Sequence, residues 1–147
     1  MEFGLTQYFS VEISDFSNSI NSLSDGINEF VKNKEYGNSI KELFIGVVCV
    51  SPKFEPFFKP RKPKYTANKK QIYKEGFNYE IERCLEYDIV IDFESFKNAS
   101  DDERVKILGE ELIKSFNVID GIKIKNKDFK IEKFRDDIEL YFKKIYS

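Results

Sequence analysis

The chain has no histidine and no tryptophan among its 147 residues, and it has two cysteines. Without histidine there is no Ser-His or Cys-His nucleophile pair, no His-ligated zinc and no imidazole general base. Cys49 and Cys84 lie too far apart in sequence to build a zinc ribbon. Each lies in a strand-like segment, and no secretory signal pattern is visible, so we expect two buried, reduced thiols in a cytoplasmic protein.

Phosphate-binding and membrane-spanning patterns are also missing. Gly76, Gly109 and Gly121 are isolated, so there is no glycine-rich loop for a nucleotide, and we expect no cofactor. The longest apolar run, Leu43–Val50, is far too short to cross a bilayer. We therefore expect no membrane partner.

Carboxylates are the remaining candidates for chemistry. Asp88, Asp92 and Glu94 share one face of a predicted strand and offer oxygen ligands for Mg²⁺. Strand rise places Asp88 and Asp92 about 13 Å apart, too far to share an ion unaided. We therefore interpret these carboxylates as a solvated strand face, and predict neither a metal site nor enzymatic activity.

Tyr79 to Phe93 is the most regular run in the sequence. Its odd positions are almost all apolar, and its even positions carry Glu80, Glu82, Glu86, Asp88 and Asp92. A period of two predicts one long strand with a buried face and an acidic face, unless a turn or bulge near Gly76 divides the segment.

The other elements follow from hydrophobic periodicity. We expect a strand over 3–13, a helix over 16–32 in which Gly26 marks a close crossing, and an interior strand at 43–50. A proline-broken connection follows at 51–75, then a helix capped by Ser100, a short edge strand at 122–127 and a helix over 131–145. With 41% hydrophobic residues the chain has material for a core. We predict a single α+β domain over 1–147, its sheet mainly antiparallel and its helices packed on one side.

Charge is segregated along the chain. Residues 51–75 hold eight Lys or Arg and two Glu, whereas residues 76–104 hold three bases and nine acids. The two segments either neutralise each other in the fold, or leave an acidic patch that attracts a basic partner. The aromatic residues of the basic loop also suit stacking on nucleic-acid bases, although a net charge of −2 disfavours general nucleic-acid binding.

Three segments resemble a known family. These are residues 87–99, the Ser-capped helix with Ile107-Leu108 and residues 112–115, and residues 128–134 followed by Asp137-Ile138. Together they resemble bacterial immunity proteins of polymorphic toxin systems, in particular the immunity protein 44 family. The similarity covers the C-terminal half, with a looser match to the first strand and to Leu43–Val50. It implies a cytoplasmic, non-enzymatic protein that binds and blocks a cognate toxin domain.

The residues themselves suggest how a toxin would be met. If the toxin is a nuclease, its basic cleft suits a steering face of Glu80, Glu82, Glu86 and Asp88. Aromatic anchors from the loop would slow release, and the candidates are Phe57, Phe58 and Tyr65. The protein is either a monomer or a homodimer joined through an exposed edge strand. The alternative function is a nucleic-acid-binding or phage-encoded regulatory module that uses loop 51–75.

Overall fold

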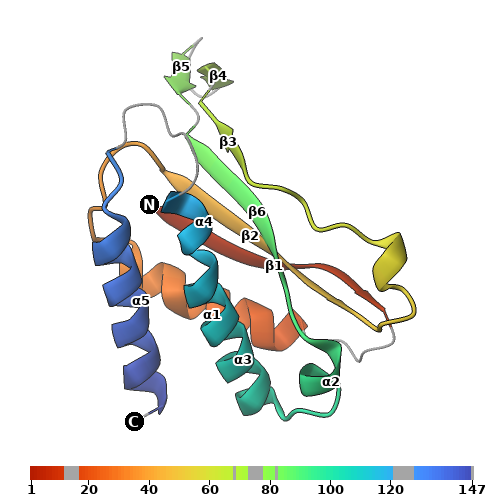
Figure 1. Cartoon of the computed structure of the whole chain (residues 1–147). Helices are drawn as coiled ribbons and strands as arrows, with labels where there is room; N and C mark the ends of the chain where they lie inside the picture. The colour runs from red at the N-terminus through yellow and green to blue at the C-terminus, as the bar shows by residue number, and fades with distance from the viewer. Residues whose placement is uncertain (12–16, 68, 73–77, 82, 121–127, 147) are drawn as a thin grey trace.

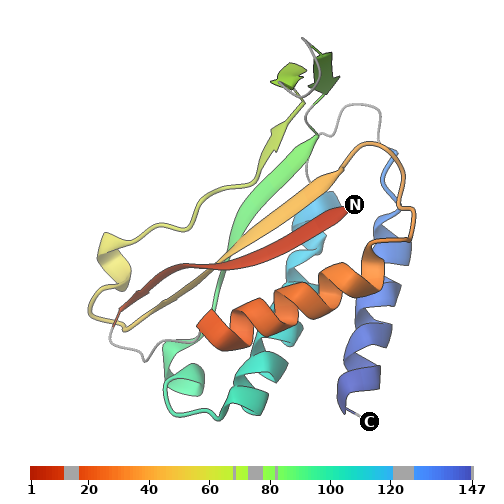
Figure 2. The same cartoon turned by 180° about the vertical axis from the view of Figure 1, so that it is seen from behind.

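The computed structural model describes residues 1–11, 17–67, 69–72, 78–81, 83–120 and 128–146. Figure 1 shows a four-stranded sheet with helices on one face and a two-stranded hairpin beyond one end of it. Figure 2 shows the same layers from behind, with α1 running across α3 and α5. The strands are β1 (Glu2–Val11), β2 (Glu42–Val50), β3 (Lys64–Thr66), β4 (Lys69–Ile72), β5 (Asn78–Ile81) and β6 (Cys84–Val90). The helices are α1 (Ser17–Val31), the 3₁₀ turn η1 (Glu55–Phe57), α2 (Phe93–Phe96), α3 (Asp101–Ser115), α4 (Asn117–Asp120) and α5 (Ile131–Tyr146).

The large sheet has the order β1-β2-β6-β3, in which β1, β2 and β6 are parallel and β3 is antiparallel to β6. The α+β class is confirmed, but the prediction of a mainly antiparallel sheet is wrong, because the sheet is mixed. Parallel neighbours need a long crossover connection. Helix α1 lies in the connection from β1 to β2. The connection from β2 to β6 contains β3 and the β4–β5 hairpin instead of a long helix, so no helical periodicity in the sequence indicated that β2 and β6 are parallel.

The predicted strand from Tyr79 to Phe93 is divided. Its first residues belong to β5, which pairs with β4 in the hairpin, whereas β6 lies in the large sheet. Within β6 the predicted alternation holds, because Leu85, Tyr87 and Ile89 are buried and Glu86 is exposed. The expected turn near Gly76 lies outside the described residues.

One apolar core fills the space between the sheet and the helices. Its centre is aromatic: the Phe134 ring of α5 lies 5.0 Å from the Phe116 ring and 5.1 Å from the Tyr36 ring. Burial of each such side chain contributes on the order of 2 kcal/mol. The predicted close crossing at Gly26 is confirmed, because a Cβ there would collide with the Tyr141 hydroxyl of α5.

The helix boundaries follow from capping. The Ser100 side chain accepts a hydrogen bond from the Glu103 N–H at 3.2 Å, which confirms the predicted N-cap of α3. Asp92 caps the short helix α2 by accepting from the Ser95 N–H at 2.9 Å, an element that the sequence did not reveal. The edge strand expected at 122–127 lies outside the described residues.

Strand β1 forms one edge of the sheet, and α1 covers part of that edge. The Phe3 N–H donates to Asn28 Oδ1 and the Leu5 N–H donates to Ser24 Oγ, both at 2.9 Å. Unpaired strand N–H groups are templates for pairing with another chain. Here two side chains of α1 accept from the Phe3 and Leu5 N–H groups, so these two groups are not available to an edge-to-edge homodimer, one of the two alternatives left open by the sequence.

Candidate interaction surface

The face of the sheet that points away from the helices is the candidate site. It carries the even-numbered side chains of β2 and β6, which alternate with the buried odd-numbered ones. In register across the two strands, Phe44 lies opposite Glu86, Gly46 opposite Asp88 and Val48 opposite Val90. The connection after β2 turns at η1 and returns beside β6 (Figure 1, yellow). This helix-free face is therefore bordered by the basic loop that the sequence singled out.

An ion pair fixes the loop on the sheet. The side chain of Asp88 is fully covered, and its carboxylate accepts from the Arg61 backbone N–H at 2.6 Å and from Arg61 Nε at 2.9 Å. Arg61 Nη2 lies 2.8 Å from the same carboxylate. This hydrogen bonding raises the pKa of Arg61 above its ordinary value. The prediction that loop and sheet neutralise each other is therefore confirmed for this pair.

Gly46 and Tyr8 complete the binding site of the Arg61 guanidinium. A Cβ on Gly46 would collide with Asp88 Oδ1 and would lie 2.7 Å from Arg61 Nη2, so glycine leaves the space that the ion pair fills. The Arg61 guanidinium carbon lies 3.9 Å from the centroid of the Tyr8 ring, a cation–π stack. The Phe58 ring packs beside Tyr8 with 6.1 Å between centroids.

Large side chains remain exposed around this stack. Phe57 of η1 is 86% exposed, Tyr8 is 45% exposed and Val90 is 49% exposed. Exposed lysines follow η1 along the returning loop, at Lys59, Lys62 and Lys64. Among the described residues, no carboxylate forms an ion pair with these three ammonium groups. The exposed aromatic ring beside these lysines makes this part of the surface a candidate for binding.

The four predicted acidic residues do not lie on one strand. Glu86 is exposed on β6, opposite Lys64 of β3 in the register, and Asp88 is engaged by Arg61. Glu80 lies on β5, in the other sheet. Glu82 lies outside the described residues.

The three predicted aromatic anchors occupy different environments. Phe57 is exposed, and Phe58 is half-buried against Tyr8. Tyr65 is also half-buried, and its hydroxyl donates to the Ser39 carbonyl. Tyr65 thus ties β3 to the loop before β2.

Sequence reasoning missed Tyr8, Gly46 and Arg61 as parts of this surface. A glycine within an otherwise bulky interior strand was an available signal for a close approach. Tyr8 has the opposite parity to the buried Phe3 and Leu5 of β1, so alternation along that strand was an available signal for it.

The carboxylates considered for Mg²⁺ have other roles. Hydrogen bonds from the Ser95 hydroxyl and then from its backbone N–H hold the pKa of Asp92 below its ordinary value. Glu94 pairs with Lys97 at 2.9 Å. Within the described part of the chain no three His, Cys, Asp or Glu side chains are grouped to hold a metal. Both cysteines are buried and free, as predicted, and burial raises the pKa of the Cys49 thiol to about 11.

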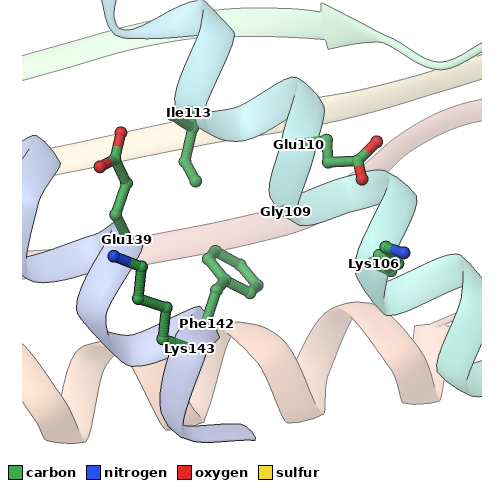
Figure 3. A pocket seen from close by; sticks show the side chains of 7 residues that line it. All are labelled: Lys106, Gly109, Glu110, Ile113, Glu139, Phe142 and Lys143. Carbon is green, nitrogen blue, oxygen red and sulfur yellow. The ribbon is translucent and has the colours of Figure 1, made fainter. Parts of the chain in front are cut away.

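A pocket lies in the helical layer, away from the candidate surface. This pocket of about 420 Å³ lies between α3 and α5, with Phe142 next to Gly109 and Ile113, and with charged side chains around it (Figure 3). A Cβ on Gly109 would lie 2.5 Å from the Phe142 ring, so these helices pack closely at the base of the pocket. The charged side chains are Lys106, Glu110, Glu139 and Lys143. With two lysines and two glutamates around an apolar base, this pocket suits a small contact with another molecule better than it suits catalysis.

Comparisons with known proteins bear on the whole chain. The curated proteins and the solved structures gave no match. In the ranges that the structure describes, no helix is both long enough and apolar enough to cross a bilayer. The family model of immunity protein 44 matches residues 1–144, which extends the resemblance through the N-terminal half. The chain therefore belongs to the immunity protein 44 family.

Proposed function

We propose that this protein binds a cognate toxin domain and neutralises it by stoichiometric, non-catalytic blocking. The observation that carries the proposal is the family match over residues 1–144. The exposed Tyr8 and Val90 on the helix-free face, and the exposed Phe57 of η1, add support, because apolar side chains gain from burial by a partner. In this proposal the chain acts as one domain, in the cytoplasm of the cell that it protects.

A nuclease as the toxin is a finer proposal with narrower support. It rests on acidic residues that would enter a basic substrate cleft. Asp88 is occupied by Arg61, so Glu86 is the one of the four predicted acids whose side chain is described as exposed. Truncation of Glu86 together with Glu80 would weaken binding to a nuclease toxin and slow its capture.

Co-expression tests the proposed function directly. The reading frame adjacent to this gene is induced in a host with this chain or with an empty vector, and growth is followed. We expect the neighbour to arrest growth alone and this chain to restore it, with the two proteins co-purifying in a one-to-one ratio. A harmless neighbour, or killing that continues in the presence of the chain, would contradict the proposal.

Nucleic-acid binding is the second candidate, favoured by the exposed lysines beside Phe57. A gel shift with single-stranded and duplex DNA at low salt distinguishes nucleic-acid binding from toxin binding. Binding that weakens steeply with salt would support this candidate, because phosphate contacts release counterions. Absence of a shift at low salt would remove it.

A further inference from the structure

The loop between β2 and β3 presents an unusual combination of side chains. We define the basic segment as residues 53–64, which include η1 and run beside β6 (Figure 1). Lys59, Lys62 and Lys64 are exposed along it, and Phe57 projects from its turn with 86% of its surface exposed. Burial of this ring by a partner would remove its apolar surface from water.

The basic segment is held in place before any partner arrives. Arg61, near its C-terminal end, is held against the covered Asp88 by hydrogen bonds from its backbone N–H and its guanidinium, and it stacks on Tyr8. The turn at η1 is closed by hydrogen bonds from the Phe54 and Glu55 N–H groups to the Ser51 carbonyl. A segment fixed in this way loses less conformational entropy on binding than a free loop does.

The charge of the basic segment indicates the chemistry of its partner. An extended chain of five residues spans at most about 17 Å, so Lys59 and Lys64 act on one patch of an opposing surface. Their attraction for opposite charge extends about 8 Å through physiological salt, far enough to steer encounter. Among the residues that the structure describes, the ion pair on this face joins Arg61 to Asp88 and involves none of the three lysines, so these lysines remain for a partner.

A protein surface fits this segment better than a phosphate backbone does. Glu55 lies in η1 beside Phe57, and Glu86 is exposed opposite Lys64. A phosphate backbone is negative at every step and would meet these carboxylates as well as the lysines, whereas a protein surface can place its acids opposite the lysines alone. An acidic protein surface with a pocket for one aromatic ring satisfies both the lysines and Phe57.

We infer that the basic segment is the toxin-binding element, with Lys59, Lys62 and Lys64 meeting an acidic surface of the toxin and Phe57 entering a pocket on it. This inference rests on the proposed function and reverses the charge assignment made from the sequence. Arg61 is a positioning residue, because its guanidinium is engaged with Asp88 and Tyr8.

The test compares paired variants against the neighbour-encoded toxin that the unchanged chain neutralises. Lys59→Glu/Lys62→Glu lowers the association rate constant at least about tenfold at low salt, and the loss shrinks at high salt. The control Lys106→Glu/Lys143→Glu makes the same change in net charge on the helical layer and leaves the rate within about twofold.

Phe57→Ala raises the dissociation rate constant about tenfold or more, whereas Leu140→Ala, at a 44% exposed position on α5, leaves it unchanged. Thermal unfolding of each variant establishes that the fold is intact, and both side chains are open enough that no loss is expected.

The outcomes separate the two proposals. If the unchanged chain does not neutralise the neighbour, the proposed function fails and the inference fails with it. If it neutralises the neighbour and the lysine and Phe57 variants bind as tightly as the unchanged chain, the inference alone is overturned. A gel shift that the lysine variant abolishes, with toxin binding retained, would assign the segment to nucleic acid instead.

Discussion

The ion pair between Arg61 and Asp88 is asymmetric, and the asymmetry predicts how its removal affects stability. The side chain of Asp88 is 0% exposed, whereas that of Arg61 is 42% exposed. Removing Arg61 leaves a covered carboxylate that keeps one donor, the backbone N–H. Removing Asp88 leaves two donors of an exposed residue, the Arg61 guanidinium and the Arg61 backbone N–H, and water can replace the acceptor of both. We therefore expect Arg61→Ala to cost more free energy of unfolding than Asp88→Ala.

The magnitude lies between two limits. An exposed ion pair contributes about 0.2–1 kcal/mol, and breaking a buried pair costs about 3–5 kcal/mol. With one partner covered and the other half open, we expect Arg61→Ala to cost about 2 kcal/mol and Asp88→Ala about 1 kcal/mol. Arg61→Lys keeps the positive charge but loses the bidentate guanidinium geometry. Its free energy of unfolding should therefore lie between those of the unchanged chain and Arg61→Ala.

Urea unfolding of the two single variants and the double variant forms a complete cycle. The double variant removes both the covered charge and its partner, so it costs less than the sum of the single variants by about 1 kcal/mol. Additivity within about 0.3 kcal/mol would show that the two side chains are energetically independent, and a larger loss for Asp88→Ala would refute the asymmetry.

Three further outcomes are expected. Gly46→Ala costs about 1–3 kcal/mol in urea unfolding, because its Cβ meets the Asp88 carboxylate; Asp88→Ala should relieve most of that loss. Ser24→Ala leaves the Leu5 N–H without its acceptor, costing about 1–3 kcal/mol and promoting association seen in sedimentation. Because burial raises the pKa of Cys49 from 9.0 to about 11, its stabilising contribution is complete below pH 9 and is lost towards pH 11. The stability difference from Cys49→Ala should therefore shrink over that interval.

Elements with a strong local signal were predictable from the sequence. The capping box at Ser100, the apolar stripe of α5 and the fully apolar β2 each fix their own structure locally. Gly26 was identified as a close crossing, because a glycine inside a strong helical pattern needs a packing reason. The α+β class followed from these elements.

Sheet topology was not predictable by the same means. Strand direction depends on where the chain re-enters the sheet, and the crossover between β2 and β6 lacks a helix that would reveal it. The division of the run from Tyr79 to Phe93 did leave a signal in the sequence. Arg83 stands at an apolar position of the alternation and Cys84 at a polar one, at the point where β5 ends and β6 begins in a different sheet.

The charge pattern along β6 predicted only part of the candidate surface. Alternation correctly placed Asp88 on the face opposite the core, but it carries no information about what covers that face. The cover comes from the loop around Arg61, 27 residues earlier, whose backbone and side chain both contact Asp88, and it depends on a glycine in β2 and on Tyr8 of β1. Since the loop cancels that acidic charge and keeps its own lysines exposed, the net character of the surface beside β6 shifts towards positive. A partner selected for this face would therefore be recognised through the basic segment, and the lysine variants should alter its capture more than substitution of Glu86.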